Sequence, residues 1–155
     1  MRILVCSDTH GDFYALNQAI SEQPEAEIII HLGDGAEEAE EMRAIYPDRM
    51  VIQVKGNGDF GSRYPLVDEY LLAGKHVLMT HGHLYGVKTE LYTLYLLAKE
   101  KNIDLLLFGH THQAFQDYQN GLYVLNPGTL KGVNATYGIV DITQSGIITN
   151  IITLR

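Results

Sequence analysis

Short apolar runs alternate with helical patterns over the first two thirds of the chain. Continuous apolar runs predict strands at residues 2–7, 27–32, 50–54 and 104–108. Apolar side chains at helical spacing predict helices over residues 12–22, 36–45 and 88–101. Two further runs, at residues 67–72 and 76–79, are separated by a short turn and predict a β-hairpin. Alternation of strands and helices is typical of an α/β domain with parallel strands.

The pattern changes after residue 113, where short apolar runs are separated only by turns. The runs cover residues 114–118, 122–125, 137–142 and 147–154, with turn signals such as Asn120-Gly121 and Ser145-Gly146 between them. Hairpins without helices predict a second, largely antiparallel sheet stacked on the first. We therefore expect one α/β domain over residues 1–155, a two-sheet αββα sandwich in which a mixed sheet packs on the largely antiparallel one.

Polar side chains that bind metals follow the ends of the predicted strands. These residues are Asp8 and His10, Asp34, Asn57, His81, and the pair His110 and His112 in Gly109-His110-Thr111-His112. Each alone is more typical of an ordinary surface or core residue, but together they recur where α/β folds place binding sites. Carboxylate, amide and imidazole groups without thiolate suit Mn²⁺, Fe²⁺, Zn²⁺, Ni²⁺ or Co²⁺. The sequence therefore predicts a metal site at one edge of the sheets.

Charge and composition narrow the range of partners. The formal net charge is -8 with only 11 Lys and Arg residues, which disfavours long nucleic acid. A small phosphorylated molecule remains compatible, because bound divalent cations would invert the local charge. No apolar run approaches the roughly 20 residues that span a bilayer, and the start turns polar too soon for a signal peptide. We expect a cytoplasmic protein without a membrane partner, in which the single Cys6 is a small core residue.

The motifs, taken in order, resemble those of the calcineurin-like metallophosphoesterases, and among them the small single-domain bacterial and archaeal phosphodiesterases. The resemblance extends from Asp8-Thr9-His10 to Asn126-Pro127-Gly128-Thr129. It implies a phosphoric diester hydrolase with two divalent ions, Mn²⁺ first, with Ni²⁺, Zn²⁺, Fe²⁺ or Co²⁺ as alternatives. It also implies the ligand sets: Asp8, His10, Asp34 and His112 for one ion, and Asp34, Asn57, His81 and His110 for the other. A hydroxide between two such ions is a nucleophile at neutral pH.

The third motif departs from the family pattern. Many members have a histidine after the asparagine of this motif, thought to protonate the leaving group, and this chain has Gly58. A positioned acid contributes roughly 10²–10⁴ in rate, so unactivated monoesters should be poor substrates and a small phosphodiester is favoured. His83 is the other candidate for proton transfer, with plain solvent exposure as the alternative. Asp59 is expected to orient His81, with turn formation as the alternative. The predicted catalytic set is Asn57, His81, His83 and Asp59.

Several questions stay open from the sequence. The alternatives to a phosphodiesterase are a non-catalytic protein-binding scaffold of the same fold and a phosphomonoesterase. A scaffold tolerates loss of metal ligands, whereas this chain keeps the full set, and Gly58 argues against the monoesterase. Arg63 and Lys131 could contact a phosphate, although each is more typical of a surface charge. The natural substrate, the metal and the oligomeric state, a homo-oligomer included, are not fixed by the sequence.

Overall fold

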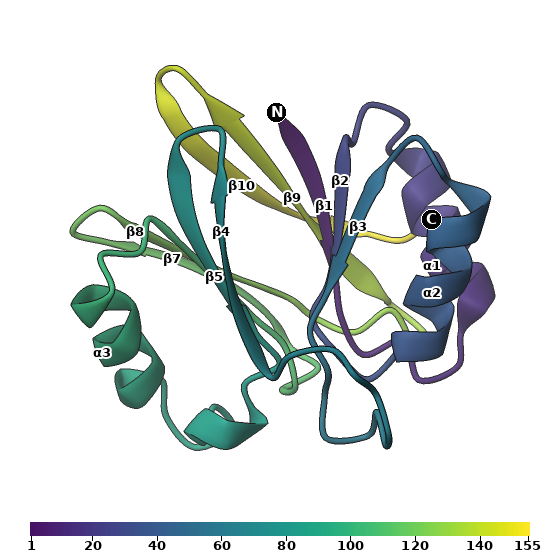
Figure 1. Cartoon of the computed structure of the whole chain (residues 1–155), viewed down its shortest axis with the longest axis horizontal. Helices are drawn as coiled ribbons and strands as arrows, with labels where there is room; N and C mark the ends of the chain where they lie inside the picture. Colours follow the sequence, from purple (N-terminus) through teal and green to yellow (C-terminus); the bar gives the residue numbers. More distant parts are fainter.

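The computed structural model describes residues 1–155 as two five-stranded sheets packed against each other (Figure 1). The first sheet has the order β10-β9-β1-β2-β3. Its strands are β1 (Arg2–Cys6), β2 (Ile28–His31), β3 (Met50–Gln53), β9 (Thr136–Thr143) and β10 (Gly146–Thr153). The second sheet has the order β4-β5-β6-β8-β7. Its strands are β4 (Val67–Leu72), β5 (Lys75–Thr80), β6 (Leu105–Phe108), β7 (Ala114–Gln119) and β8 (Leu122–Pro127).

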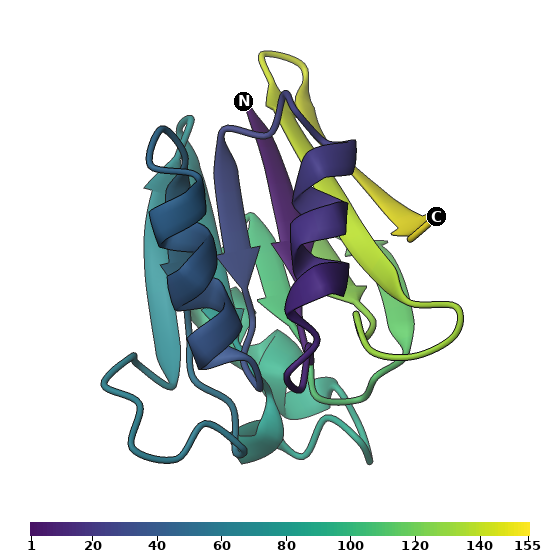
Figure 2. The same cartoon turned by 90° about the vertical axis from the view of Figure 1, so that its right-hand side faces the viewer.

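Helices cover the outer faces of both sheets. Helices α1 (Phe13–Glu22) and α2 (Ala36–Ile45) lie on the first sheet, and α3 (Tyr92–Glu100) lies on the second (Figures 1 and 2). The 3-10 helix η1 (His83–Tyr85) precedes α3. This arrangement confirms the predicted αββα sandwich. None of the helices has the length and apolar character needed to cross a membrane.

The apolar runs of the sequence fill the space between the layers. A cluster of 16 buried residues lies between the two sheets and includes Val5, Ile30, Met79 and Leu107. Separate clusters join α1 and α2 to the first sheet and α3 to the second. Strands β1, β2 and β6 are therefore covered on both faces, which explains why their sequences are continuously apolar.

The pairing of the last four strands differs from the prediction. The β7–β8 hairpin joins the second sheet, with β8 parallel to β6, whereas the β9–β10 hairpin joins the first, with β9 antiparallel to β1. The expected largely antiparallel second sheet is thus wrong, because both sheets are mixed. Turn chemistry specifies a hairpin locally, but the choice of sheet depends on which strand edge is left to be paired.

The third helix is shorter than predicted. It begins at Tyr92 rather than at residue 88, and the residue before it, Leu91, makes no side-chain capping hydrogen bond. Gly82 and Gly86 both have positive φ angles, 105° and 62°. They stand at the two ends of the short turn η1, which lies before the start of α3. The apolar spacing therefore identified the buried face of this helix but not its start.

Candidate metal centre

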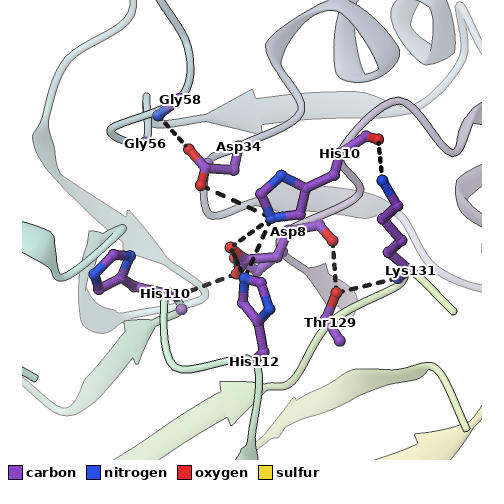
Figure 3. A network of polar contacts seen from close by, with 12 residues as sticks. Asp8, His10, Asp34, Gly56, Gly58, His110, His112, Thr129 and Lys131 are labelled. Carbon is purple, nitrogen blue, oxygen red and sulfur yellow. Dashed lines mark hydrogen bonds and ion pairs between the residues drawn. The ribbon is translucent and has the colours of Figure 1, made fainter. Parts of the chain in front are cut away.

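Four of the predicted ligands meet where β1, β5 and β6 end, and three of them, Asp8, His10 and His112, can be followed in Figure 3. Asp8 Oδ1 lies 3.1 Å from His112 Nε2, 3.5 Å from His10 Nε2 and 3.8 Å from His81 Nε2. Asp8 and His81 are fully buried, whereas the side chains of His10 and His112 are 34% and 47% exposed. The donors thus form a site with a buried floor and an accessible mouth.

The side chain of Asp34 lies close to both His10 and His81. Its Oδ2 atom is 3.4 Å from His81 Nε2 and 3.9 Å from His10 Nε2. His110 Nδ1 lies 3.1 Å from His81 Nε2. The donor atoms form two overlapping sets that are compatible with metal binding, one of Asp8, His10 and His112 and the other of Asp8, Asp34 and His81.

Asn57 is the one predicted ligand outside this group. Its side chain is exposed and makes no hydrogen bond, while the glycines on either side of it approach Asp34. The Gly58 N–H donates to Asp34 Oδ1 at 2.7 Å. A Cβ atom on Gly56 would clash with that same oxygen. The backbone of this turn therefore supports Asp34, and only glycine permits the approach at position 56.

The backbone at most of these donors is in the left-handed region. The positive φ angles are 56° at Asp8, 45° at His10, 56° at Asp34, 69° at His110 and 60° at His112. This region costs a non-glycine residue about 1–2 kcal/mol, although Asp and His tolerate it better than branched residues. Strain of this kind persists where surrounding structure enforces it, and it clusters at functional sites.

Asp8 carries a buried oxygen that the protein leaves without a hydrogen-bond donor. Its Oδ2 atom accepts from Ser7 Oγ at 2.6 Å and from the His110 N–H at 3.1 Å. Its Oδ1 atom has no partner, although it is the atom that three imidazoles surround. Burying a carboxylate oxygen without a partner is unfavourable. A cation among these donors would satisfy that oxygen, so the residues fit a divalent first-row metal.

The titratable groups of the site shift one another's pKa values. Burial lowers the pKa of His81, but its hydrogen bond to Asp34 and the charges of Asp8 and Asp34 raise it overall. Burial raises the pKa of Asp34, but hydrogen bonds from His81 and the Gly58 N–H lower it overall. Burial and the charge of His81 lower the pKa of His110 to about 4. A metal entering this site therefore competes with a proton on His81.

Asp59 has a different role from the predicted one. Its carboxylate accepts hydrogen bonds from the backbone N–H groups of Asp34 at 2.8 Å, Gly35 at 3.0 Å, Ala36 at 3.1 Å and Gly56 at 2.8 Å. These include amides at the start of α2, which no side chain of the helix itself caps. Asp59 thus caps α2 and joins the turn that contains Gly56 to the loop that carries Asp34.

His81 is oriented by the backbone instead. Its Nδ1 atom lies 2.8 Å from the Leu32 carbonyl oxygen, which can only accept a hydrogen bond. The Nδ1 atom therefore carries the proton and Nε2 faces the donor group. The expectation that Asp59 orients His81 is wrong, because the amides of α2 and the neighbouring loops occupy the Asp59 carboxylate.

His83 lies beside the donor group. Its ring centre is 5.5 Å from that of His81 and 6.1 Å from that of His110, and the residue is half-buried in η1. Its Nδ1 atom is buried without a hydrogen-bond partner. Burial and the charge of His81 lower its pKa. The ring of His83 thus lies close to the centre, and its Nδ1 atom has no partner within the protein.

A buried chain of hydrogen bonds, which the sequence did not indicate, supports the loops that carry Asp8, His10 and Asp34. Glu38 accepts from Thr9 Oγ1 at 2.9 Å and from the Gly11 N–H at 2.5 Å. Thr9 Oγ1 lies 3.0 Å from His31 Nε2, and His31 Nδ1 accepts from the Gly33 N–H at 3.2 Å. Glu38 belongs to the acidic run of α2, where a solvated side chain is usual, but it is only 8% exposed.

The segment after β8 supports the same loops from the other side. Thr129 Oγ1 donates to the Asp8 carbonyl at 2.7 Å, and Lys131 Nζ donates to the His10 carbonyl at 3.2 Å (Figure 3). Asn126 Nδ2 donates to the loop that carries the histidine pair, 3.1 Å from a backbone carbonyl oxygen. Lys131 therefore has a structural partner at the site, and Asn126 connects the turn at residues 126–128 to the loop of the histidine pair.

Comparison with known proteins identifies the family. Residues 1–145 match the model described as the calcineurin-like phosphoesterase superfamily domain, and the chain belongs to this family. It is 38% identical over 135 residues to the probable metallophosphoesterase YsnB of Bacillus subtilis, covering 84% of this chain and 76% of the relative. It is 28% identical over 170 residues to the phosphodiesterase YfcE of Escherichia coli, covering 91% and 88%. The resemblance inferred from the motifs is thus confirmed.

A solved structure agrees with this assignment. A predicted phosphoesterase from Streptococcus pneumoniae superposes with a TM-score of 0.82 and 26% identity, covering 98% of this chain and 88% of that one. The chain is therefore a metallophosphoesterase by family, with a site whose residues can bind metal.

Proposed function

We propose that the protein is a metal-dependent phosphodiesterase that hydrolyses a small diester at a centre of two divalent ions. The observation that carries this proposal is the buried Asp8 Oδ1 atom, which has no hydrogen-bond donor and faces three imidazole nitrogens. Further support comes from YfcE, a relative named as a phosphodiesterase. Mn²⁺ is the ion we expect first from the family resemblance, and the donor set, which has no thiolate, also suits Ni²⁺, Zn²⁺, Fe²⁺ or Co²⁺.

The proposed ligand sets follow the family motifs. One ion is assigned to Asp8, His10, Asp34 and His112, and the other to Asp34, Asn57, His81 and His110. A bridging role for Asp34 is supported by its Oδ2 atom, which lies within 3.9 Å of His10 Nε2 and 3.4 Å of His81 Nε2. Asn57 is assigned by its motif alone, since its side chain makes no hydrogen bond.

The chain's own residues supply orientation and proton transfer. When bound, the ions supply charge stabilisation and activation of water. The Leu32 carbonyl holds His81 with Nε2 toward the centre, and Asp59 fixes the loop that carries Asp34. Position 58 offers no proton donor, so we assign proton transfer at the leaving oxygen to the protonated form of His83, whose ring centre lies 5.5 Å from that of His81. Limited acid catalysis favours diesters with good leaving groups over unactivated monoesters.

A comparison of two aryl substrates tests this function. We expect the Mn²⁺-loaded protein to hydrolyse an activated aryl phosphodiester faster than the matching monoester, and a chelator to abolish both activities. Asn57→Ala and His81→Ala should remove most activity, whereas His76→Ala should not, because His76 is an exposed residue of β5 that contacts none of the donors. A faster monoester rate would indicate a phosphomonoesterase. Absence of any metal-dependent hydrolysis would favour the protein-binding scaffold.

A further inference from the structure

A cleft with a volume of about 1110 Å³ adjoins the donor group. Its walls are the first turns of α2 and the loop of residues 58–64, and it opens onto His10 and Asp34, which line it. Pockets for whole small molecules are typically about 300–1,000 Å³. The cleft therefore has room for a substituent much larger than the phosphate that reacts at the donor group.

Phe60 presents an uncovered aromatic ring to this cleft. The side chain is 94% exposed and lines the cleft, so the ring packs against almost nothing in the protein. The loop beneath it is nevertheless fixed. Asp59 binds the amides at the start of α2, the Ser62 N–H donates to the Asp59 carbonyl at 3.2 Å, and Lys55 Nζ donates to the Ser62 carbonyl at 3.4 Å. The backbone that carries Phe60 is thus held at the wall of the cleft, and the ring itself is not part of the core.

The charges around the cleft disfavour a second anionic group. The α2 wall carries Glu37 and Glu41, whose side chains are exposed and form no ion pair. The lining contains only two cations, Arg63 and Lys131, against six carboxylates, so its own charge is negative. An uncharged substituent is therefore better accommodated here than a further phosphate or carboxylate.

We infer that this cleft binds the ester substituent beyond the reacting phosphate, and that Phe60 selects an uncharged planar aromatic group by stacking on it. The inference rests on the proposed function and specifies its substrate class, diesters with one uncharged aromatic ester group. Aromatic rings in offset or edge-to-face contact gain about 0.5–1.5 kcal/mol beyond the area that they bury. Phe60 is thus a specificity-determining residue rather than a metal ligand or a core residue.

Binding of two phosphonates tests this inference without relying on turnover. Phenylphosphonate and cyclohexylphosphonate carry the same metal-binding group and rings of similar size, but only the first ring is planar and aromatic. We expect calorimetry on the Mn²⁺-loaded protein to give an affinity about three- to tenfold higher for phenylphosphonate. Phe60→Ala should remove this preference and leave the affinity for Mn²⁺ and the melting temperature unchanged. Tyr14→Ala should retain the preference, because Tyr14 is 81% exposed but does not line the cleft.

The outcomes separate this inference from the proposed function. If both phosphonates bind with equal affinity, and Phe60→Ala changes neither of these affinities, the aromatic site is refuted while phosphate binding at the metals stands. If neither binds, the proposed function fails and the inference fails with it. A Phe60→Ala variant that changes the oligomeric state but not the preference would instead show that Phe60 belongs to an interface between copies.

Discussion

Asp8 and His112 lie in loops that follow strands of different sheets, yet Asp8 Oδ1 lies 3.1 Å from His112 Nε2. Asp8 follows β1 of the first sheet and His112 follows β6 of the second. A cation held by both residues would therefore join the two sheets at the edge where the binding loops meet. The consequences of this relationship can be tested by stability as well as by activity.

Metal binding should stabilise the fold through Asp8. A ligand present at 100 times its Kd stabilises the native state by about 2.7 kcal/mol. We expect saturating Mn²⁺ to raise the melting temperature of chelator-treated protein, and Asp8→Asn to remove most of that rise, because a neutral amide binds a divalent cation more weakly than a carboxylate does. Thermal denaturation with and without EDTA measures both effects. An equal rise in Asp8→Asn would remove Asp8 from the centre.

The pKa shifts of His81 and Asp34 make the stability of the metal-free protein depend on pH. In the metal-free protein, His81 has a raised pKa. Its contribution to the stability of the fold is therefore complete below its ordinary pKa of 6.5 and is lost as the pH rises through the pKa of the folded state. Asp34 has a lowered pKa, so its contribution to the stability of the fold is complete above its ordinary pKa of 3.8 and is lost as the pH falls through the pKa of the folded state. In the metal-free protein, the ion pair between Asp34 and His81 therefore stabilises the native state most between pH 3.8 and 6.5.

The raised pKa of His81 also predicts that stabilisation of the protein by metal increases with pH. A metal at His81 Nε2 must displace a proton, so its affinity falls as His81 becomes protonated. We expect the Mn²⁺-induced rise in melting temperature to be larger at about pH 7.5 than at about pH 5.5. Melting curves with and without Mn²⁺ across this range give the difference directly. A larger effect at the acidic end would contradict the assignment of His81 as a ligand.

The buried chain through Thr9 should affect metal affinity more than folding. Thr9→Val keeps the shape of the side chain but removes the hydroxyl that joins Glu38 to His31. Loss of groups that orient metal ligands typically costs about 10–100-fold in affinity, so we expect a Mn²⁺ Kd at least about tenfold weaker. Thr9→Ser should restore most of the affinity. If calorimetry gives the same Kd for Thr9→Val and the wild type, the chain has no positioning role.

His83 should matter most for substrates with poor leaving groups. A positioned proton donor contributes roughly 10²–10⁴ in rate, and little of this is needed when the leaving group is an activated phenolate. We expect His83→Ala to reduce kcat for an alkyl diester at least tenfold more than kcat for a p-nitrophenyl diester. Its affinity for Mn²⁺ should stay unchanged. A uniform loss on both substrates would point to a structural role for His83.

The sequence predicted the strands and the donor positions because both follow from local rules. Buried parallel strands are continuously apolar, and the loops at their carboxyl ends gather at one edge, so the amino-acid pattern alone places Asp8, Asp34 and His81 together. The assignment of the last hairpins to sheets could not be predicted, because it depends on unpaired edges far away in the sequence. Turn residues carry no information about those edges.

The supporting hydrogen bonds were harder to predict than the donors. Glu38 lies in an acidic run, and its only signal was its position one helical turn before the buried Met42. Asp59 was expected to face His81, but its carboxylate instead caps α2 from a separate loop. Such contacts depend on how loops distant in sequence pack together. Hydrophobic periodicity and motif spacing do not encode that packing.

Anomalous diffraction from crystals soaked in Mn²⁺ tests the central claim most directly. The proposed centre predicts two manganese peaks about 3.5–4 Å apart, as in other two-metal sites. One peak should be bound by Asp8 and His112, the other by His81 and His110, with Asp34 between them. Absence of manganese at these side chains, or manganese bound elsewhere on the protein, would contradict the account.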